Sequence, residues 1–132
     1  MMAKNLFFIL LISAAYAAYP GSSAQTGSGG KPRITFVELG SVNCIPCKKM
    51  QPIMKSVEKR YGNQVKVVFH DVWKEDQKHF STKYGIKLIP TQVFLDSDGK
   101  EIFRHEGFFP EKDIDKFLQS KGVTPVENKE RK

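Results

Sequence analysis

The 132-residue chain has only two cysteines, Cys44 and Cys47, and they stand three positions apart. They lie between an apolar run, residues 34–39, and a segment with helical periodicity, residues 48–61. If a helix begins at or just after Cys44, the first thiol lies at the positive end of the helix dipole, where a thiolate is stabilised. Cys47, one helical turn further on, can then reach the sulfur of Cys44. The spacing therefore indicates a dithiol that exchanges electrons with another disulfide.

Two other roles of the cysteine pair stay open at this point. A structural disulfide across so short a loop would restrict the unfolded chain little, because the entropic gain grows with loop length. A zinc site normally needs four ligands, and the sequence has neither a second CxxC pair nor closely spaced histidines. Redox exchange is the favoured interpretation, with no metal and no cofactor other than the Cys44–Cys47 disulfide itself.

The N-terminal residues have the pattern of an export signal. Lys4 is followed by the apolar residues 6–14 and by Ala15-Tyr16-Ala17, a small-x-small cleavage sequence. We expect a signal peptide over residues 1–17, with cleavage after Ala24 as the second choice and an uncleaved membrane tether as the alternative. The apolar run is short for a bilayer span. These residues predict a periplasmic or otherwise extracytoplasmic location.

The remaining sequence divides into three parts. Residues 18–32 are rich in Gly and Ser and are expected to be a flexible tether. Residues 33–123 are expected to form one domain, and residues 124–132 a disordered charged tail. The net charge of +7 comes from lysines spread along the chain, which indicates a solvated basic surface, with attraction to an anionic membrane or acidic partner as the alternative. No basic run with interleaved aromatic residues indicates nucleic-acid binding.

Hydrophobic periodicity within the domain predicts four strands and three helices in the order β-α-β-α-β-β-α. The strands are expected at residues 33–39, 65–72, 91–95 and 100–106, and the helices at residues 48–61, 74–84 and 110–121. The first three strands, joined through helices, are expected to be parallel, and the fourth to pair by a hairpin across residues 96–99. The prediction is an α/β fold with a central four-stranded mixed sheet flanked by helices.

At this point residues 33–122 resemble the thioredoxin-fold superfamily, and in particular its secreted thiol:disulfide oxidoreductases. The resemblance rests on Cys44-Ile45-Pro46-Cys47 after a strand, on Pro52 in the helix, on the segment KYGIKLIPT at residues 83–91, and on Gly99 and Gly107. It implies that Ile45 and Pro46 tune the reduction potential. The extra N-terminal strand and helix of that family are missing here.

The resemblance also implies where a client protein binds. Ile89, Pro90 and Thr91 would lie beside Cys44, and the backbone of Ile89 would bind an extended client segment by strand addition. A cis bond is rare except before proline, so Ile89–Pro90 is expected to be cis, with a trans proline that merely opens a strand as the alternative. Gly107 would let the client chain approach closely, or would simply end its strand.

Glu38 stands six residues before Cys44, where this family often has a buried acid. Burial would raise the pKa of the carboxyl group, which could then accept and return a proton near neutral pH. We expect it to serve Cys47, the resolving thiol. The alternative is a partly exposed carboxylate at the end of a strand, with no role.

The chain also departs from the family pattern. Asn43 replaces the usual tryptophan before the first cysteine, and Phe69 stands where a lysine often pairs with the buried acid. Trp73 lies in a different loop and is expected to be a packing residue. Phe108 and Phe109 are expected to cap the core rather than line the client surface.

The expected function is reduction of disulfides in client proteins outside the cytoplasm. A membrane electron-donor protein of the cytochrome-c-biogenesis type would recharge the dithiol, and the chain would act as a monomer. The alternatives are a dithiol oxidase or isomerase, and a non-catalytic peptide-binding module. The short interval at residues 73–89 favours the reductase, because the related oxidases often carry a helical insertion there.

Overall fold

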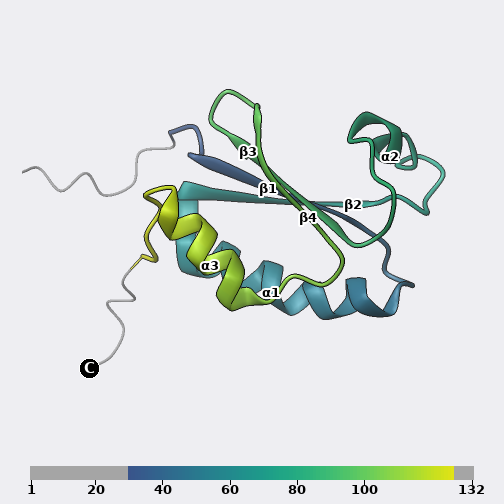
Figure 1. Cartoon of the computed structure of the whole chain (residues 1–132), viewed down its shortest axis with the longest axis horizontal. Helices are drawn as coiled ribbons and strands as arrows, with labels where there is room; N and C mark the ends of the chain where they lie inside the picture. Colours follow the sequence, from purple (N-terminus) through teal and green to yellow (C-terminus); the bar gives the residue numbers. More distant parts are fainter. Residues whose placement is uncertain (1–29, 127–132) are drawn as a thin grey trace, which may run out of the picture.

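The computed structural model describes residues 30–126. The predicted signal peptide, most of the predicted tether and the end of the predicted tail lie outside the described residues. The elements, in chain order, are β1 (Ile34–Gly40), α1 (Ile45–Tyr61), the short 3-10 helix η1 (Gly62–Gln64), β2 (Val65–Asp71), α2 (His79–Lys83), β3 (Thr91–Asp96), β4 (Glu101–Glu106) and α3 (Glu111–Ser120) (Figure 1). The predicted order of helices and strands is confirmed.

The four strands form one mixed sheet in the order β2-β1-β3-β4. β1 and β2 are parallel as predicted, and β3 and β4 form the predicted antiparallel hairpin. The prediction that the third strand runs parallel to the first was wrong, because β3 is antiparallel to β1. The physical reason is the length of the connection. α1 has 17 residues and spans about 25 Å, whereas α2 has five and spans only about 7 Å. α2 therefore cannot carry the chain back along the sheet, and β3 starts at the end where β2 finishes.

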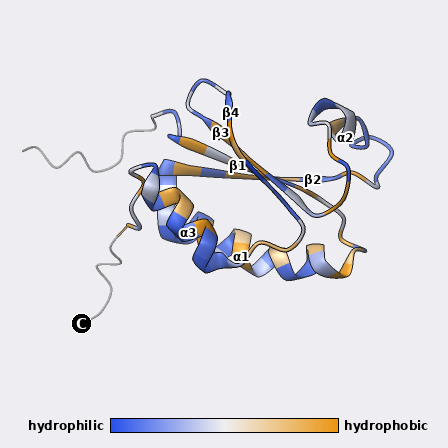
Figure 2. Cartoon of the chain, in the orientation of Figure 1, coloured by the Kyte–Doolittle hydropathy of each residue, from blue (hydrophilic) through white to orange (hydrophobic). Residues whose placement is uncertain are grey.

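Helices α1 and α3 cover one face of the sheet, whereas α2 lies at one end (Figure 1). The larger core lies between the sheet and these two helices, with Phe36 and Phe94 stacked at 4.8 Å between ring centroids. A smaller core on the other face contains Val37, Leu39 and Val93, against which Phe80 of α2 packs. Figure 2 shows orange, hydrophobic segments along the strands and blue, hydrophilic ones along much of α1 and α3.

The helix predicted at residues 74–84 is shorter in the structure. Residues 72–78 form turns, and only His79–Lys83 is helical. Asp71 explains part of this, because its backbone N–H bonds the side chain of Gln77 and its carbonyl accepts from Lys74 N. These bonds fold the segment into turns directly after β2. Within residues 30–126 no helix is both long enough and apolar enough to cross a bilayer.

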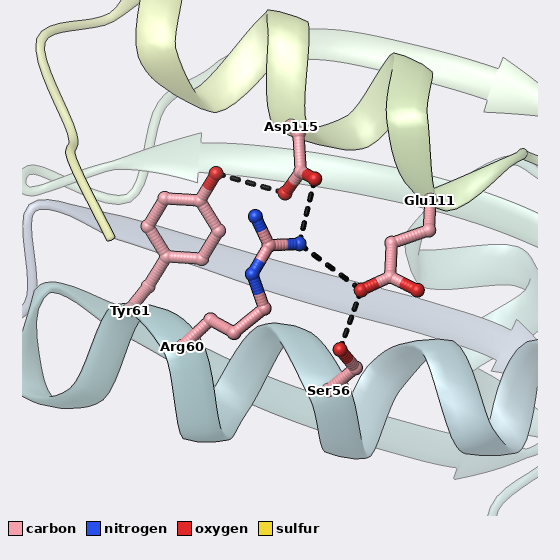
Figure 3. Close-up of polar contacts among 5 residues, drawn as sticks. All are labelled: Ser56, Arg60, Tyr61, Glu111 and Asp115. Carbon is pink, nitrogen blue, oxygen red and sulfur yellow. Dashed lines mark hydrogen bonds and ion pairs between the residues drawn. The ribbon is translucent and has the colours of Figure 1, made fainter. Parts of the chain in front are cut away.

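A polar cluster joins the C-terminal end of α1 to α3 (Figure 3). Arg60 donates to Asp115 at 2.6 Å and to Glu111 at 3.1 Å, and the Tyr61 hydroxyl donates to Asp115 at 2.8 Å. Ser56 also donates to Glu111. Nη1 of Arg60, shared between the two carboxylates, and the buried ring of Tyr61 fix the register of the two helices. The cluster lies at the opposite end of α1 from the cysteines.

Candidate functional site

The cysteine pair occupies the first turn of α1. Cys44 is the N-cap residue, with φ −91° and ψ 125°, and its sulfur accepts from Cys47 N at 3.4 Å. The two cysteines form a disulfide with their Cα atoms 5.2 Å apart. Pro46 fits the first helical turn because its missing N–H would have no partner there. The helix begins at Ile45, directly after Cys44 and three residues before the predicted start at residue 48, and the sulfur of Cys44 lies where the helix dipole stabilises a thiolate.

The two sulfurs differ in how a client can reach them. Cys44 is 8% exposed and Cys47 is 0% exposed, while Ile45 between them is 72% exposed. Pro46 is exposed as well. An incoming disulfide therefore meets Cys44 first, and Cys47 can act only from within. This supports the order of attack expected from the resemblance, with Cys44 as nucleophile and Cys47 as the resolving thiol.

Gly40, the last residue of β1, makes room for Cys47. A Cβ atom on Gly40 would lie 3.2 Å from both the Cβ and the Sγ of Cys47, and 3.4 Å from the ring of Phe69. A side chain there would crowd the resolving sulfur. The sequence analysis did not single out Gly40. The available signal was a glycine ending an apolar strand, four residues before the first cysteine.

Glu38 lies on the same face of β1 as Gly40, two residues earlier, because alternate residues of a strand share a face. It is 0% exposed, and its neighbours across the sheet are Phe69 of β2 and Gln92 of β3. Gln92 Nε2 donates to Glu38 Oε1 at 3.4 Å. Burial raises the pKa of Glu38 to about 8, and the bond from Gln92 opposes this rise. The carboxyl is therefore buried rather than at an exposed strand end, and Phe69 does occupy the position expected for it.

The proline loop lies at the same end of the sheet as the disulfide. The peptide bond Ile89–Pro90 is cis, as predicted. Thr91 is buried and its hydroxyl donates to Leu88 O at 2.7 Å. Among the described residues no hydrogen bond engages the backbone N–H or C=O of Ile89. Both groups are thus available to an added strand.

A backbone hydrogen bond from Gly107 connects the chain after β4 to this loop. Its N–H donates to Pro90 O at 2.7 Å, and its φ of +88° lies in the left-handed region that favours glycine. No atom lies within 4 Å of the position that its Cβ would take. Backbone conformation, and not lack of space, therefore requires glycine here. The structure thus brings Gly107 and Pro90 together.

Asp71, at the end of β2, holds two loops of the site, and the sequence analysis missed it. Its carboxylate accepts from Val42 N and from Trp73 N, both at 3.2 Å. Burial acts to raise the pKa of Asp71, but these hydrogen bonds outweigh it and leave the pKa below its usual value. The loop that leads into Cys44 is therefore tied to the end of the neighbouring strand. The only sequence signal was an aspartate that ends an apolar strand.

Exposed hydrophobic side chains gather around this end of the sheet. The register places the loops after β1, β2 and β4 and the loop before β3 together, because Gly40 pairs with Asp71 and Thr91 pairs with both Leu39 and Glu106. These loops and the first turn of α1 carry five exposed large hydrophobic residues: Val42, Ile45, Trp73, Leu88 and Phe108. Such a gathering is typical of a surface that binds another protein.

Two predictions about aromatic residues were wrong. Trp73 was expected to pack inside, but it is 61% exposed and lines a depression of about 290 Å³ with Val72, Ser81, Ile86, Lys87, Leu88 and Ile89. The turns after β2 carry it outward, because Asp71 binds its backbone. Phe109 is buried as predicted, but Phe108 is 42% exposed. The left-handed Gly107 turns the chain just before these two residues, and only the second reaches the core.

No group of three or more His, Cys, Asp or Glu side chains within residues 30–126 is placed to hold a metal ion. His105 stacks on Phe109 with 4.1 Å between ring centroids, and its Nε2 lies 3.1 Å from Phe108 O. His70 stacks on Phe80 at 3.5 Å. These two histidines pack against aromatic rings.

Comparison with known proteins agrees with this geometry. Residues 22–122 match the family described as Thioredoxin-like domain. The chain is 27% identical to thioredoxin of Bacillus subtilis over 73% of this chain and 86% of that protein. It is 33% identical to thioredoxin of Borreliella burgdorferi over 62% of this chain and 67% of that protein. The solved structure of Fasciola hepatica thioredoxin superposes with a TM-score of 0.58 at 28% identity, covering 68% of this chain and 82% of that one. With its Cys44–Cys47 pair at the start of α1, the chain belongs to the thioredoxin-like domain family and is a thioredoxin-like thiol:disulfide oxidoreductase.

Proposed function

We propose that the chain is a reductase of disulfides in exported client proteins. The observation that carries the proposal is the difference between the two sulfurs. Cys44, at the start of α1, keeps 8% of its surface exposed, whereas Cys47 behind it, on the face of β1 that carries Glu38, is 0% exposed. Such a pair suits an attack by the first thiolate and a resolving attack by the second.

In the first step, the Cys44 thiolate attacks one sulfur of the client disulfide. A Cys44–client bond forms, the client S–S bond breaks, and one client thiolate leaves and takes up a proton. The helix N-terminus supports this step because it stabilises the attacking thiolate.

In the second step, the Glu38 carboxylate takes the proton of the Cys47 thiol, directly or through one water molecule. The Cys47 thiolate attacks the Cys44 sulfur, the Cys44–client bond breaks, and the second client thiolate leaves. Two electrons have passed from the dithiol to the client, and the chain ends as the Cys44–Cys47 disulfide. Glu38 then returns its proton to solvent or to the client thiolate.

The surface around the dithiol supports binding of an extended client segment. The free N–H and C=O of Ile89 would pair with the client backbone beside Pro90 and Thr91, and Gly107 would leave room on the other side. The depression beside Trp73 would take an apolar client side chain. Ile45 and Pro46, exposed between the cysteines, would contact the client and tune the reduction potential.

The proposed location is outside the cytoplasm, and it rests on the export-type pattern of residues 1–17. Glutathione and the cytoplasmic thioredoxin system do not reach that compartment. The proposed electron source is therefore a membrane protein that passes electrons outward, of the cytochrome-c-biogenesis type. Apocytochromes and wrongly oxidised exported proteins are the proposed clients.

The test is a turnover and trapping experiment with insulin, whose chains precipitate once their disulfides are reduced. The wild-type chain with excess dithiothreitol should accelerate precipitation. Cys47→Ser and Cys44→Ser should each stop turnover. When the variants are first reduced and then freed of dithiothreitol, Cys47→Ser should accumulate a mixed disulfide with insulin through Cys44, and Cys44→Ser should not. Wild-type chain that binds insulin without reducing it would contradict the reductase and favour a peptide-binding module.

A further inference from the structure

Glu38 and Gln92 form a buried polar pair beside the dithiol. Both side chains are 0% exposed, and the two residues face each other directly across β1 and β3. A buried polar side chain without a reason is rare, because a lost hydrogen bond in the interior destabilises the fold. Gln92 occupies a core position where an apolar residue would pack without this penalty.

Each of the two side chains has one buried oxygen without a hydrogen-bond partner among the described residues. Gln92 Nε2 donates to Glu38 Oε1 at 3.4 Å, whereas Glu38 Oε2 and Gln92 Oε1 are buried without a partner among the described residues. The amide must turn its NH₂ group toward an ionised carboxylate, since two oxygens facing each other would repel. One carboxyl oxygen is thus held, and the other is left to carry a proton.

Besides Gln92, the groups that face Glu38 from the surrounding elements are an aromatic ring, the disulfide and one histidine. β2 contributes Phe69, and α1 contributes the disulfide of Cys44 and Cys47 above Gly40. β4 contributes His105, which pairs with Gln92 but is bound to Phe108 O. Among the described residues only Gln92 donates a hydrogen bond to the carboxyl group.

We propose that Gln92 is a positioning residue for proton transfer: its amide N–H holds Oε1 of Glu38, so that Oε2 is the oxygen that exchanges a proton with Cys47. This rests on the proposed function, because it assigns the proton step of the same dithiol. The uncharged amide stabilises the carboxylate less than a lysine would. Glu38 therefore stays a weak acid whose pKa, about 8, suits proton exchange with a thiol.

Loss of the hydrogen bond from Gln92 should change the pKa of Glu38 in one direction only. Since the bond from Gln92 lowers the pKa of Glu38 and burial raises it, removing the bond should move the pKa further up. Less carboxylate would then be present at pH 7, and the Cys47 attack should slow there. Above the new pKa the carboxylate returns, and the rate should return with it.

The experiment measures the attack of Cys47 alone. A mixed disulfide of Cys44 with 5-thio-2-nitrobenzoate is prepared at low pH, and release of the coloured thiolate is followed by stopped flow from pH 5 to pH 10. Gln92→Met removes the amide at similar volume, and Gln119→Met, on the exposed side of α3, is the matched control. Glu38→Gln and the double variant E38Q/Q92M complete a thermodynamic cycle.

We expect Gln92→Met to shift the pH profile upward by about one unit and to slow release roughly tenfold at pH 7. Gln119→Met should leave the profile unchanged, and Gln92→Met should have no further effect in the Glu38→Gln background. An unshifted profile, or equal slowing at every pH, would overturn the positioning role. Should Gln92→Met unfold, Gln92→Asn and the carboxyl ¹³C titration of Glu38 provide the same comparison. If the wild-type chain reduces insulin but the profile does not move, only this inference fails; if it reduces nothing, the proposed function fails first.

Discussion

Gly40 and Cys47 are in such close contact that a single methyl group on Gly40 would lie 3.2 Å from the resolving sulfur. The glycine at the end of β1 is therefore part of the redox site, although it carries no reactive group. It lets the first turn of α1 lie directly on the strand that holds Glu38. Close packing of this kind excludes water from the second sulfur.

Replacing Gly40 should consequently disturb the disulfide form. We expect Gly40→Ala to reduce the free energy of unfolding by about 1–3 kcal/mol, because the methyl group overpacks the site. Urea unfolding of the oxidised protein measures this. In a Cys44→Ala, Cys47→Ala background the same change should have a smaller effect, since the crowded sulfur is gone. An equal effect in both backgrounds would show that the contact with Cys47 is not the cause.

Glu38 should make the stability of the protein depend on pH. Its pKa is raised from 4.5 to about 8, so the folded state binds a proton that the unfolded state has already lost between these values. The free energy of unfolding should therefore fall as the pH rises from about 5 to about 8. We expect wild type to lose on the order of 3 kcal/mol more than Glu38→Gln over this range.

Urea titrations of the oxidised forms at pH 5 and pH 9 test this. The oxidised form is used because its cysteines do not titrate, and other groups contribute equally to both proteins. Parallel pH dependence in wild type and Glu38→Gln would contradict a raised pKa of Glu38.

Trp73 should affect recognition of protein clients but not the chemistry of the thiols. The indole is 61% exposed, so Trp73→Ala should leave the free energy of unfolding nearly unchanged. We expect the KM for a protein client to rise roughly tenfold, as for an aromatic anchor in an interface. The rate with a small disulfide such as oxidised glutathione should not change. Val126→Ala, another exposed hydrophobic residue, is the control, and equal effects on both substrates would argue against a binding role.

Asp71 should hold the loop that leads into Cys44. Asp71→Asn keeps only one acceptor oxygen for the N–H groups of Val42 and Trp73, so we expect a loss of about 1–3 kcal/mol in stability. The first attack by Cys44 should also slow, which alkylation by iodoacetamide at pH 7 measures. The control is Asp98→Asn, whose side chain is 88% exposed. If Asp71→Asn leaves the alkylation rate of Cys44 unchanged, the loop that Asp71 holds does not control the reactivity of Cys44.

Local sequence patterns predicted the parts of the site that neighbouring residues determine. The start of α1 near the cysteines and the cis bond at Pro90 follow from residue type and local order, whereas the burial of Glu38 was expected from the resemblance to the thioredoxin-fold superfamily. The direction of β3 did not, because it depends on how far a helix of five residues can carry the chain. The exposure of Trp73 depends on turns held by Asp71, and no periodicity reveals these.

The residues that the sequence analysis missed are those that act across the sheet. Gly40 matters through Cys47 on α1, and Gln92 matters through Glu38 on the neighbouring strand. Neither pairing can be read from spacing along the chain, because 54 positions separate Gln92 from Glu38. Once the strand register is known, Gln92 stands out as a buried amide opposite a buried acid.

The measurement that tests the central claim most directly is the reduction potential of the Cys44–Cys47 couple. The purified chain is equilibrated with mixtures of reduced and oxidised dithiothreitol, and the fraction of free thiol is determined by alkylation. A reductase requires a stable disulfide, so we predict a potential near the value of thioredoxin, about −270 mV. A potential near about −120 mV, as in a strong dithiol oxidant, would contradict the reductase and make the chain a disulfide donor.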